Sequence, residues 1–165
     1  MFRTILVAVD GSVVSNFGLD QAILLASEQH ATLCILHVVE EYVLVQSVDA
    51  PVYVEGLWEA LRETGKKTLS AAVAKAERRG VTTRSILAES VARPVAEVIL
   101  EQAKKCHADL IVLGTHGRRG MSRLVMGSDA EGVIREATVP VLLVRTRRTR
   151  HRARAAPTAR RRQTS

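Results

Sequence analysis

Aromatic residues are scarce in this chain of 165 residues. It holds one Trp, two Tyr and two Phe, although 47% of its residues are hydrophobic. The core must therefore be built from Val, Ile, Leu and Ala, a composition that is typical of buried parallel sheets. A chain of this length has room for one domain with a proper core.

The sequence also lacks long apolar runs and has little cysteine. No apolar stretch approaches the length that crosses a bilayer, and Asp10 interrupts the first one early. We therefore expect neither a signal peptide nor a transmembrane helix, and a cytoplasmic protein. The two cysteines, Cys34 and Cys106, do not suggest a disulfide framework.

Two familiar phosphate-binding motifs are absent. No Gly-x4-Gly-Lys-Ser/Thr occurs, because Gly65-Lys66 lacks both the earlier glycine and the hydroxyl residue. No Gly-x-Gly-x-x-Gly follows the first predicted strand. The sequence thus argues against a P-loop motor and against a dinucleotide dehydrogenase.

The net charge of +7 comes from one end of the chain. Nine of the 24 basic residues are arginines within residues 145–165, where no acidic residue occurs. Residues 1–144 keep the other 15 together with all 17 acidic residues, a net charge of −2. We expect a folded domain over residues 1–145 and a basic, disordered tail over residues 146–165. The tail is either a solvated extension or a weak, salt-sensitive contact for nucleic acid or anionic lipid.

Apolar runs alternate with helical patterns along the domain. The expected strands and helices are, in order, residues 4–9, 14–29, 31–39, 57–79, 82–88, 94–106, 109–113, 128–137 and 139–144. Residues 40–55 have no clear period and are predicted as a loop, and Gly80 suits a helix C-cap. This alternation predicts a single α/β domain with a mainly parallel open sheet and helices on both faces.

The most informative segment is LGTHGRRGMSRLVMGS, residues 113–128. Gly114 directly after a strand lets another group approach the backbone. Gly117 and Gly127 would permit conformations that a Cβ forbids, so that successive amides form an anion nest. Arg118 and its neighbours add positive charge. This pattern predicts a phosphate site, and its alternative is a solvated turn.

Ser128 begins the helix that follows this loop. We expect its hydroxyl to cap the helix or to bind phosphate, because Ser128-x-x-Glu131 is a capping-box pattern. The positive end of the helix would favour an anion.

Three segments together resemble the universal stress protein family over about residues 2–145. They are Val7-Ala8-Val9-Asp10-Gly11-Ser12, His37-Val38-Val39 and Gly114-x2-Gly117-x9-Gly127-Ser128, and the ending Pro140-Val141-Leu142-Leu143-Val144 also matches. The resemblance implies a Rossmann-like sheet of five strands in the order 3-2-1-4-5. In the branch that carries the motif, it implies ATP held between the first and fourth strands.

The resemblance also implies roles for single residues around the adenosine. Ala8 and Leu113 would be apolar neighbours of the base, and Val38 would offer it backbone contacts. Asp10 would lie near the ribose or base, although Asp10-Gly11 also suits a simple turn or a helix cap.

The phosphates would lie along the glycine-rich segment. Gly114 would contact the ribose and first phosphate, and Gly117, Gly127 and Ser128 would hold the phosphates. Asp129 places negative charge nearby, which a divalent cation such as Mg²⁺ would relieve.

We expect an ATP-binding stress-response sensor or adaptor, with at most slow ATP hydrolysis. Nucleotide binding would order residues 115–126 and change the surface offered to a partner. The last strand, from Val139 to Val144, would pair with its own copy in a homodimer. The alternatives are a nucleotide-free dimeric interaction module and a hydrolase that uses Asp10 and a metal. Preference for ATP, AMP or cyclic AMP stays open. His37 is expected to be a hydrogen-bonded structural residue, and neither His37 nor His116 is expected to play a chemical role.

Overall fold

The computed structural model describes residues 1–40, 54–115 and 126–145. Within them, a five-stranded sheet has the strand order β3-β2-β1-β4-β5. The elements are β1 (Thr4–Ala8), α1 (Val13–Gln29), β2 (Thr32–Glu40), α3 (Val54–Glu77), β3 (Thr83–Ser90), α4 (Val95–Lys105), β4 (Leu110–Gly114), α5 (Ser128–Glu136) and β5 (Val141–Val144). Every strand pairing is parallel, which confirms the predicted fold class and strand order.

β1 lies in the middle of the sheet, between β2 and β4. Ile5 pairs with Leu33 on one side and with Leu110 on the other. The side chains of Ile5, Leu6 and Val7 are fully buried. Because helices cover both faces of the sheet, consecutive residues of this strand are all apolar instead of alternating with polar ones.

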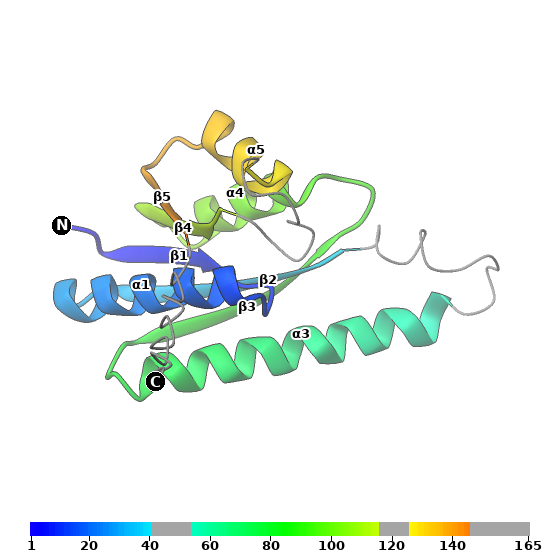
Figure 1. Cartoon of the computed structure of the whole chain (residues 1–165), viewed down its shortest axis with the longest axis horizontal. Coiled ribbons are helices and arrows are strands. Elements are labelled where there is room, and N and C mark those ends of the chain that lie inside the picture. Colours follow the sequence, from blue (N-terminus) through cyan, green and yellow to red (C-terminus); the bar gives the residue numbers. More distant parts are fainter. Residues whose placement is uncertain (41–53, 116–125, 146–165) are drawn as a thin grey trace, which may run out of the picture.

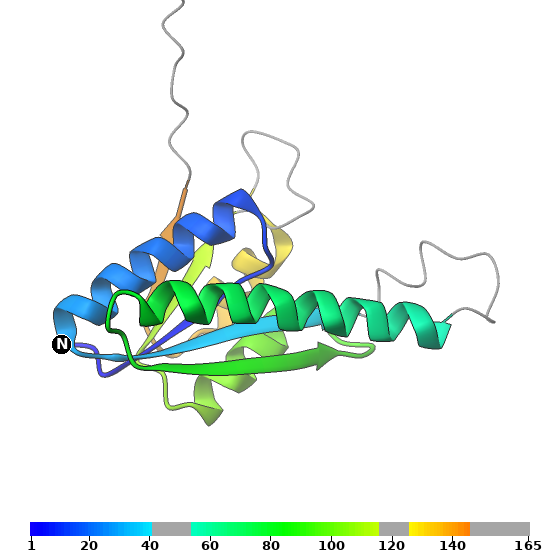
Figure 2. The same cartoon turned by 90° about the horizontal axis from the view of Figure 1, so that it is seen from below.

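The helices form two layers (Figure 1). α1 and α3 cover one face and bury a core that includes Val7 and Leu19. α4 and α5 cover the other face, over a core that includes Leu6 and Ile99. Figure 2 shows α1 and α3 together in front of the strands. The two cores supply the burial that stabilises the sheet on both sides.

The first turns of α1 pack closely on the end of β4. A Cβ at Gly114 would lie 3.0 Å from Cγ1 of Val14 and 3.3 Å from the nitrogen of Ser15. A Cβ at Gly18 would lie 3.5 Å from the nitrogen of Gly114. The glycine at the end of β4 therefore admits the start of α1, and the ribose and phosphate contact expected of Gly114 stays a prediction.

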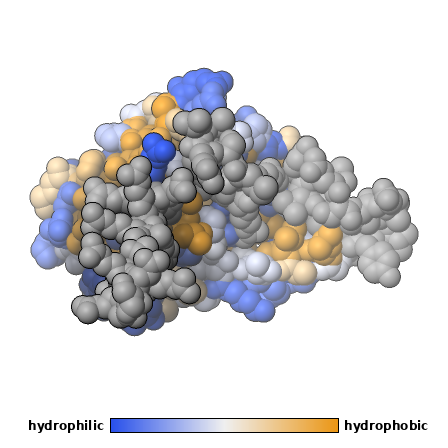
Figure 3. All heavy atoms as spheres, in the orientation of Figure 1, coloured by the Kyte–Doolittle hydropathy of each residue, from blue (hydrophilic) through white to orange (hydrophobic). Residues whose placement is uncertain are grey.

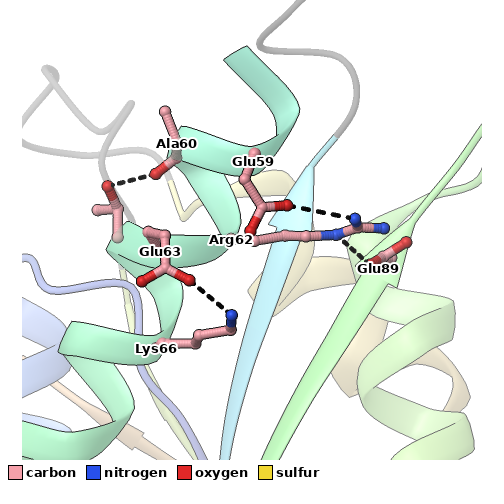
Figure 4. Close-up of polar contacts among 7 residues, drawn as sticks. Glu59, Ala60, Arg62, Glu63, Lys66 and Glu89 are labelled. Atoms are coloured by element: carbon pink, nitrogen blue, oxygen red, sulfur yellow. Dashed lines mark hydrogen bonds and ion pairs between the residues drawn. The ribbon is translucent and has the colours of Figure 1, made fainter. Parts of the chain in front are cut away.

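The N-terminal half of α3 is tied to the end of β3 by charged side chains (Figure 4). Nε of Arg62 lies 2.8 Å from a carboxylate oxygen of Glu89, and Nη1 lies 3.7 Å from Glu59. The guanidinium also sits over the ring of Trp58, 5.5 Å from its centre. Figures 1 and 2 both show this half of the helix extending past the strands. Such exposed pairs each contribute at most about 1 kcal/mol, so they orient this half more than they stabilise it.

Some predicted boundaries were wrong. α3 begins at Val54, inside the segment predicted as a loop, and β5 begins at Val141 instead of at residue 139. Most of that predicted loop, residues 41–53, lies outside the described residues. Gly80 follows α3 with φ +71°, which confirms the predicted cap. Among the described helices, none is both long and apolar enough to traverse a bilayer.

Candidate functional site

The connections of β1 and β4 diverge at their carboxyl ends. β1 continues through α1 to β2, whereas β4 continues to α5 and β5 on the opposite side. The two strands are direct neighbours, with Leu6 paired to Ile111. In open α/β sheets, ligands bind beyond the strand ends at such a divergence. The predicted site residues that the structure describes lie at or near this edge.

The turn after β1 is built by Asp10 and two serines. The Oδ1 atom of Asp10 accepts a hydrogen bond of 2.8 Å from the N–H of Ser12, and Gly11 has φ +81°. Ser12 caps α1, because its Oγ accepts a hydrogen bond of 3.1 Å from the N–H of Ser15. Of the two structural roles left open for Asp10, it therefore has the turn and not the cap.

Ser15 completes this turn, a role that was not predicted from the sequence. Its hydroxyl donates to the carbonyl of Ser12 at 3.1 Å, and the N–H of Asp10 donates to the same hydroxyl at 3.3 Å. The side chain is buried. The Ser12-x-x-Ser15 spacing at a helix start was the available signal. These bonds fix the direction in which the Asp10 carboxylate leaves the strand end.

The glycine-rich segment is held at both of its ends. The N–H of Thr115, a buried residue, donates to the carbonyl of Val144 at 3.0 Å. The N–H of Gly127 donates to the carbonyl of Thr115, also at 3.0 Å. Gly117 and Arg118 lie outside the described residues, as does His116, so the roles expected of them stay predictions. Thr115 was not singled out from the sequence, because its importance depends on β5.

The predicted helix cap at Ser128 was wrong. Gly127 is the N-cap of α5, no side chain hydrogen bond caps the helix, and Ser128 is its first residue. Glu131 does not complete a capping box, because its Oε1 accepts a hydrogen bond from Arg135 at 2.9 Å. The N–H groups in the first turn of a helix lack intrahelical acceptors, so this end suits an external acceptor.

Gly127 also differs from its predicted conformation. Its φ of −65° and ψ of 145° are extended values that any residue adopts. Glycine is therefore not required here by backbone conformation. Asp129, half-buried, lies in the first turn of α5, where a carboxylate interacts favourably with the helix dipole.

The three residues predicted to surround a base share one face of the sheet. Ala8, Val38 and Leu113 all belong to the core on the α4 and α5 side. They lie at or near the carboxyl ends of β1, β2 and β4. The start of α5 lies over this face as well, so apolar contacts and helix amides occur on one side of the strand ends.

His37 is a buried structural residue. Its Nδ1 lies 2.7 Å from the carbonyl oxygen of Val9. A Cβ on Gly65 of α3 would lie 2.7 Å from Cδ2 of the ring, so the helix backbone packs directly against the imidazole. This confirms the expectation of a hydrogen-bonded structural role.

Within residues 1–40, 54–115 and 126–145, no three His, Cys, Asp or Glu side chains are grouped to hold a metal. A cation near Asp129 would therefore need further ligands from water or from a bound phosphate.

Comparison with known proteins assigns the family. The model of the universal stress protein family matches residues 1–145. Universal stress protein YxiE of Bacillus subtilis is 39% identical over 151 residues, covering 88% of this chain and all of that protein. A crystal structure of a family protein from Burkholderia pseudomallei is 38% identical, with a TM-score of 0.69 over 85% of this chain and 93% of that one.

Two further solved structures contain nucleotides. One is a universal stress protein in complex with cAMP, 25% identical with a TM-score of 0.62, covering 87% of this chain and 97% of that one. The other is the universal stress protein of Archaeoglobus fulgidus in complex with dAMP, 25% identical with a TM-score of 0.59, covering 87% and 98%. With the parallel sheet and its strand order, these matches show that the chain belongs to the universal stress protein family.

Proposed function

We propose that this protein binds ATP at the carboxyl ends of β1 and β4 and acts as a nucleotide-dependent sensor or adaptor. The observation that carries the proposal is the shared face of Ala8, Val38 and Leu113 at the strand divergence, beside the start of α5. The adenine ring of a nucleotide needs apolar contacts, and the phosphates of the same nucleotide need hydrogen-bond donors on the same side of the sheet. The cAMP and dAMP complexes of family members support an adenine nucleotide.

The phosphates would lie at the start of α5. The N–H of Gly127 is already bonded to Thr115, so the donors begin at Ser128, with its amide and its exposed hydroxyl. Gly127 keeps the approach open because it has no side chain. Asp10, fixed by its turn, would lie on the ribose side.

Magnesium would accompany ATP at this site. Asp129 sits in the first turn of α5, where its carboxylate would repel a phosphate chain that lacked a cation. Mg²⁺ prefers octahedral oxygen ligands, commonly a carboxylate, phosphates and water. Affinity for ATP should therefore fall when Mg²⁺ is removed by EDTA, and the Asp129→Asn variant should lose most of that dependence.

The protein would form a homodimer through β5. The two edges of the sheet differ: β3 carries the charged Arg84 and Glu89, whereas β5 is Val-Leu-Leu-Val and half-buried throughout. Charges protect an edge strand from pairing, and an apolar edge invites it. Figure 3 shows apolar residues at the surface over β5 and the segment that leads into it. A second copy would cover this edge around a two-fold axis.

The test is a nucleotide inventory followed by titration. Gently purified protein should release an adenine nucleotide on denaturation, and nucleotide-free protein should bind ATP in calorimetry with Mg²⁺. AMP and cyclic AMP titrated in parallel define the preference. No bound nucleotide and no heat with any of the three would refute the site and favour the nucleotide-free interaction module.

Slow hydrolysis is a separate outcome of the same preparation. Phosphate release with Mg·ATP that disappears in Asp10→Ala, while ATP still binds, would favour the hydrolase alternative.

The arginine-rich tail, residues 146–165, lies outside the described residues, and its contact with nucleic acid or anionic lipid stays a prediction. Binding of labelled nucleic acid by the full chain and by one that ends at residue 145, at two salt concentrations, tests it.

A further inference from the structure

The two cysteines, distant in sequence, meet in the core. Cys34 lies near the start of β2, paired with Leu6 of β1, and is fully buried. Cys106 is the C-cap of α4 and is 9% exposed. Both belong to the core between the sheet and α4, and their side chains share a hydrogen bond. Both thiols are free.

This pair lies at the opposite end of the sheet from the candidate nucleotide site. Cys34 is the third residue of a parallel strand whose carboxyl end is Glu40, and Cys106 comes at the end of α4, shortly before β4 begins. An inference about the cysteines therefore stands apart from the proposed function.

The surroundings give the two thiols different chemistry. When protonated, Cys106 donates its thiol hydrogen to the carbonyl of Ala103 at 3.6 Å. The thiol of Cys34 donates to the sulfur of Cys106, and the backbone N–H groups of Ala108 and Cys106 also donate to it. Arg84 lies beside Cys34 on the neighbouring strand β3, and its positive charge also lowers the pKa of Cys106. These contacts lower the pKa of Cys106 to about 7, while the shared hydrogen bond and burial raise the pKa of Cys34. Of the two thiols, Cys106 therefore ionises first, and Cys34 keeps its proton.

The exposures match these chemical roles. Both residues are buried, but Cys106 is 9% exposed and Cys34 0%, so an oxidant that enters from the surface meets Cys106 first. A thiolate is the species that peroxides attack, and a neighbouring thiol resolves the product.

We propose that Cys106 and Cys34 form a peroxide-reactive site that closes into a reversible disulfide between the end of α4 and β2. The Cys106 thiolate attacks one oxygen of hydrogen peroxide, which gives a sulfenic acid and hydroxide. The Cys34 thiol then attacks the sulfenic sulfur; the S–S bond forms, the S–O bond breaks, and water leaves with the Cys34 proton. Both sulfurs are oxidised by one electron each, and peroxide is reduced to one water and one hydroxide, which takes up the proton that Cys106 lost on ionising. A dithiol reductant reverses the step by thiol–disulfide exchange.

The test treats the native full-length protein with hydrogen peroxide at neutral pH, then denatures it and alkylates the remaining thiols. Intact mass should show the loss of two hydrogens and no alkylation, and digestion without reductant should yield a peptide that links Cys34 to Cys106. Reduction with dithiothreitol before alkylation should restore both thiols, so that two alkyl groups are added. Circular dichroism before and after confirms that the folded protein was oxidised.

Two variants separate the roles. Cys34→Ala removes the resolving thiol, so Cys106 should accumulate as sulfenic acid, trapped by dimedone, and then as sulfinic acid. Cys106→Ala should leave Cys34 unmodified at the same dose. If wild-type protein yields only sulfinic Cys106, or disulfides solely between chains, the proposal is overturned. This result depends on the wild type alone, so it decides the question even if a variant fails to fold.

Discussion

The backbone N–H of Gly127 donates to the carbonyl of Thr115 at 3.0 Å. This bond joins the end of β4 to the cap of α5 and fixes the start of the helix that would face the phosphates. It also removes one amide from the donors available to a ligand. Gly127 therefore matters mainly because it places no side chain at the approach to α5, and less because of its backbone conformation.

Gly127→Val should weaken ATP binding while the domain stays folded. The extended conformation at position 127 is one that valine adopts readily, so the fold should tolerate the change. The added side chain would occupy the approach to the first turn of α5. We expect calorimetry to show an affinity at least about tenfold weaker, which is about 1.4 kcal/mol.

The matched control is Gly56→Val. A Cβ at Gly56 meets nothing within 4 Å, and this residue lies on α3 instead of α5. Affinity should be unchanged in that variant. Equal ATP affinity in Gly127→Val and wild type would place the phosphates elsewhere.

Gly65→Ala should destabilise the domain. Its Cβ would lie 2.7 Å from Cδ2 of His37 and 2.9 Å from Cδ1 of Leu87, both in the packed interface between α3 and the sheet. Overpacking of this kind costs about 1–3 kcal/mol. Gly56→Ala, in the same helix but in open space, should instead gain up to about 1 kcal/mol from helix propensity. Urea unfolding of both variants measures the difference, and equal effects would show that α3 does not pack this closely.

Ala92→Gly should stabilise the protein. Ala92 has φ +53°, a left-handed conformation that costs a residue with a Cβ about 1–2 kcal/mol. Glycine removes that strain but adds freedom to the unfolded chain, so the net gain should be about 0.5–1 kcal/mol. The reciprocal change is Gly80→Ala, at φ +71° with nothing within 4 Å of the new Cβ, which should cost a similar amount. Thermal unfolding with the opposite signs would contradict this account.

The sheet was predictable because its signal is distributed over many residues. Alternating apolar runs and helical patterns fix a parallel α/β domain even when single boundaries are wrong. The order of the strands rested on the family resemblance of the segments around Asp10 and Gly127, not on periodicity. Gly80 was predictable for a different reason, since a glycine just after a helical run has a local conformational cause.

The site was predictable only in part. The roles of Ala8 and Val38 rested on the family resemblance, and their shared face depends on the strand register, in which Ala8 pairs with Leu36, two residues before Val38. The cap was mispredicted because Ser128 and Gly127 both suit that position in sequence, and the choice depends on the bond from Gly127 to Thr115. The contact between the cysteines had no local signal, since it depends on how α4 lies on β2.

Leu143→Lys should convert the expected dimer to a monomer. The carbonyl of Pro140 accepts a hydrogen bond from the N–H of Ile111, and the carbonyl of Val144 accepts one from the N–H of Thr115. Backbone groups alternate in direction along a strand, so those of Val141 and Leu143 point away from β4. A lysine at this open edge would place charge where the second copy pairs, while its alkyl stem still covers the core.

Analytical ultracentrifugation across a range of concentrations measures the effect. Ser85→Lys, an exposed position on the opposite edge strand β3, is the matched control and should leave association unchanged. A wild-type protein that stays monomeric, or a loss of association only in Ser85→Lys, would contradict pairing through β5.

Alkylation of Cys106 by iodoacetamide should accelerate as pH rises through about 7, because the thiolate is the reacting species and its pKa is lowered to about 7 from an ordinary value near 9. Below that pH the thiol is protonated and the rate should fall about tenfold for each pH unit. In Cys34→Ala the donated hydrogen bond is gone, so the midpoint should move to higher pH. Arg84→Gln removes only the smallest of the effects that lower this pKa, so it should move the midpoint less. The same midpoint in wild type and in Cys34→Ala would mean that the two sulfurs are not in contact, and the disulfide proposed between them would fail with it.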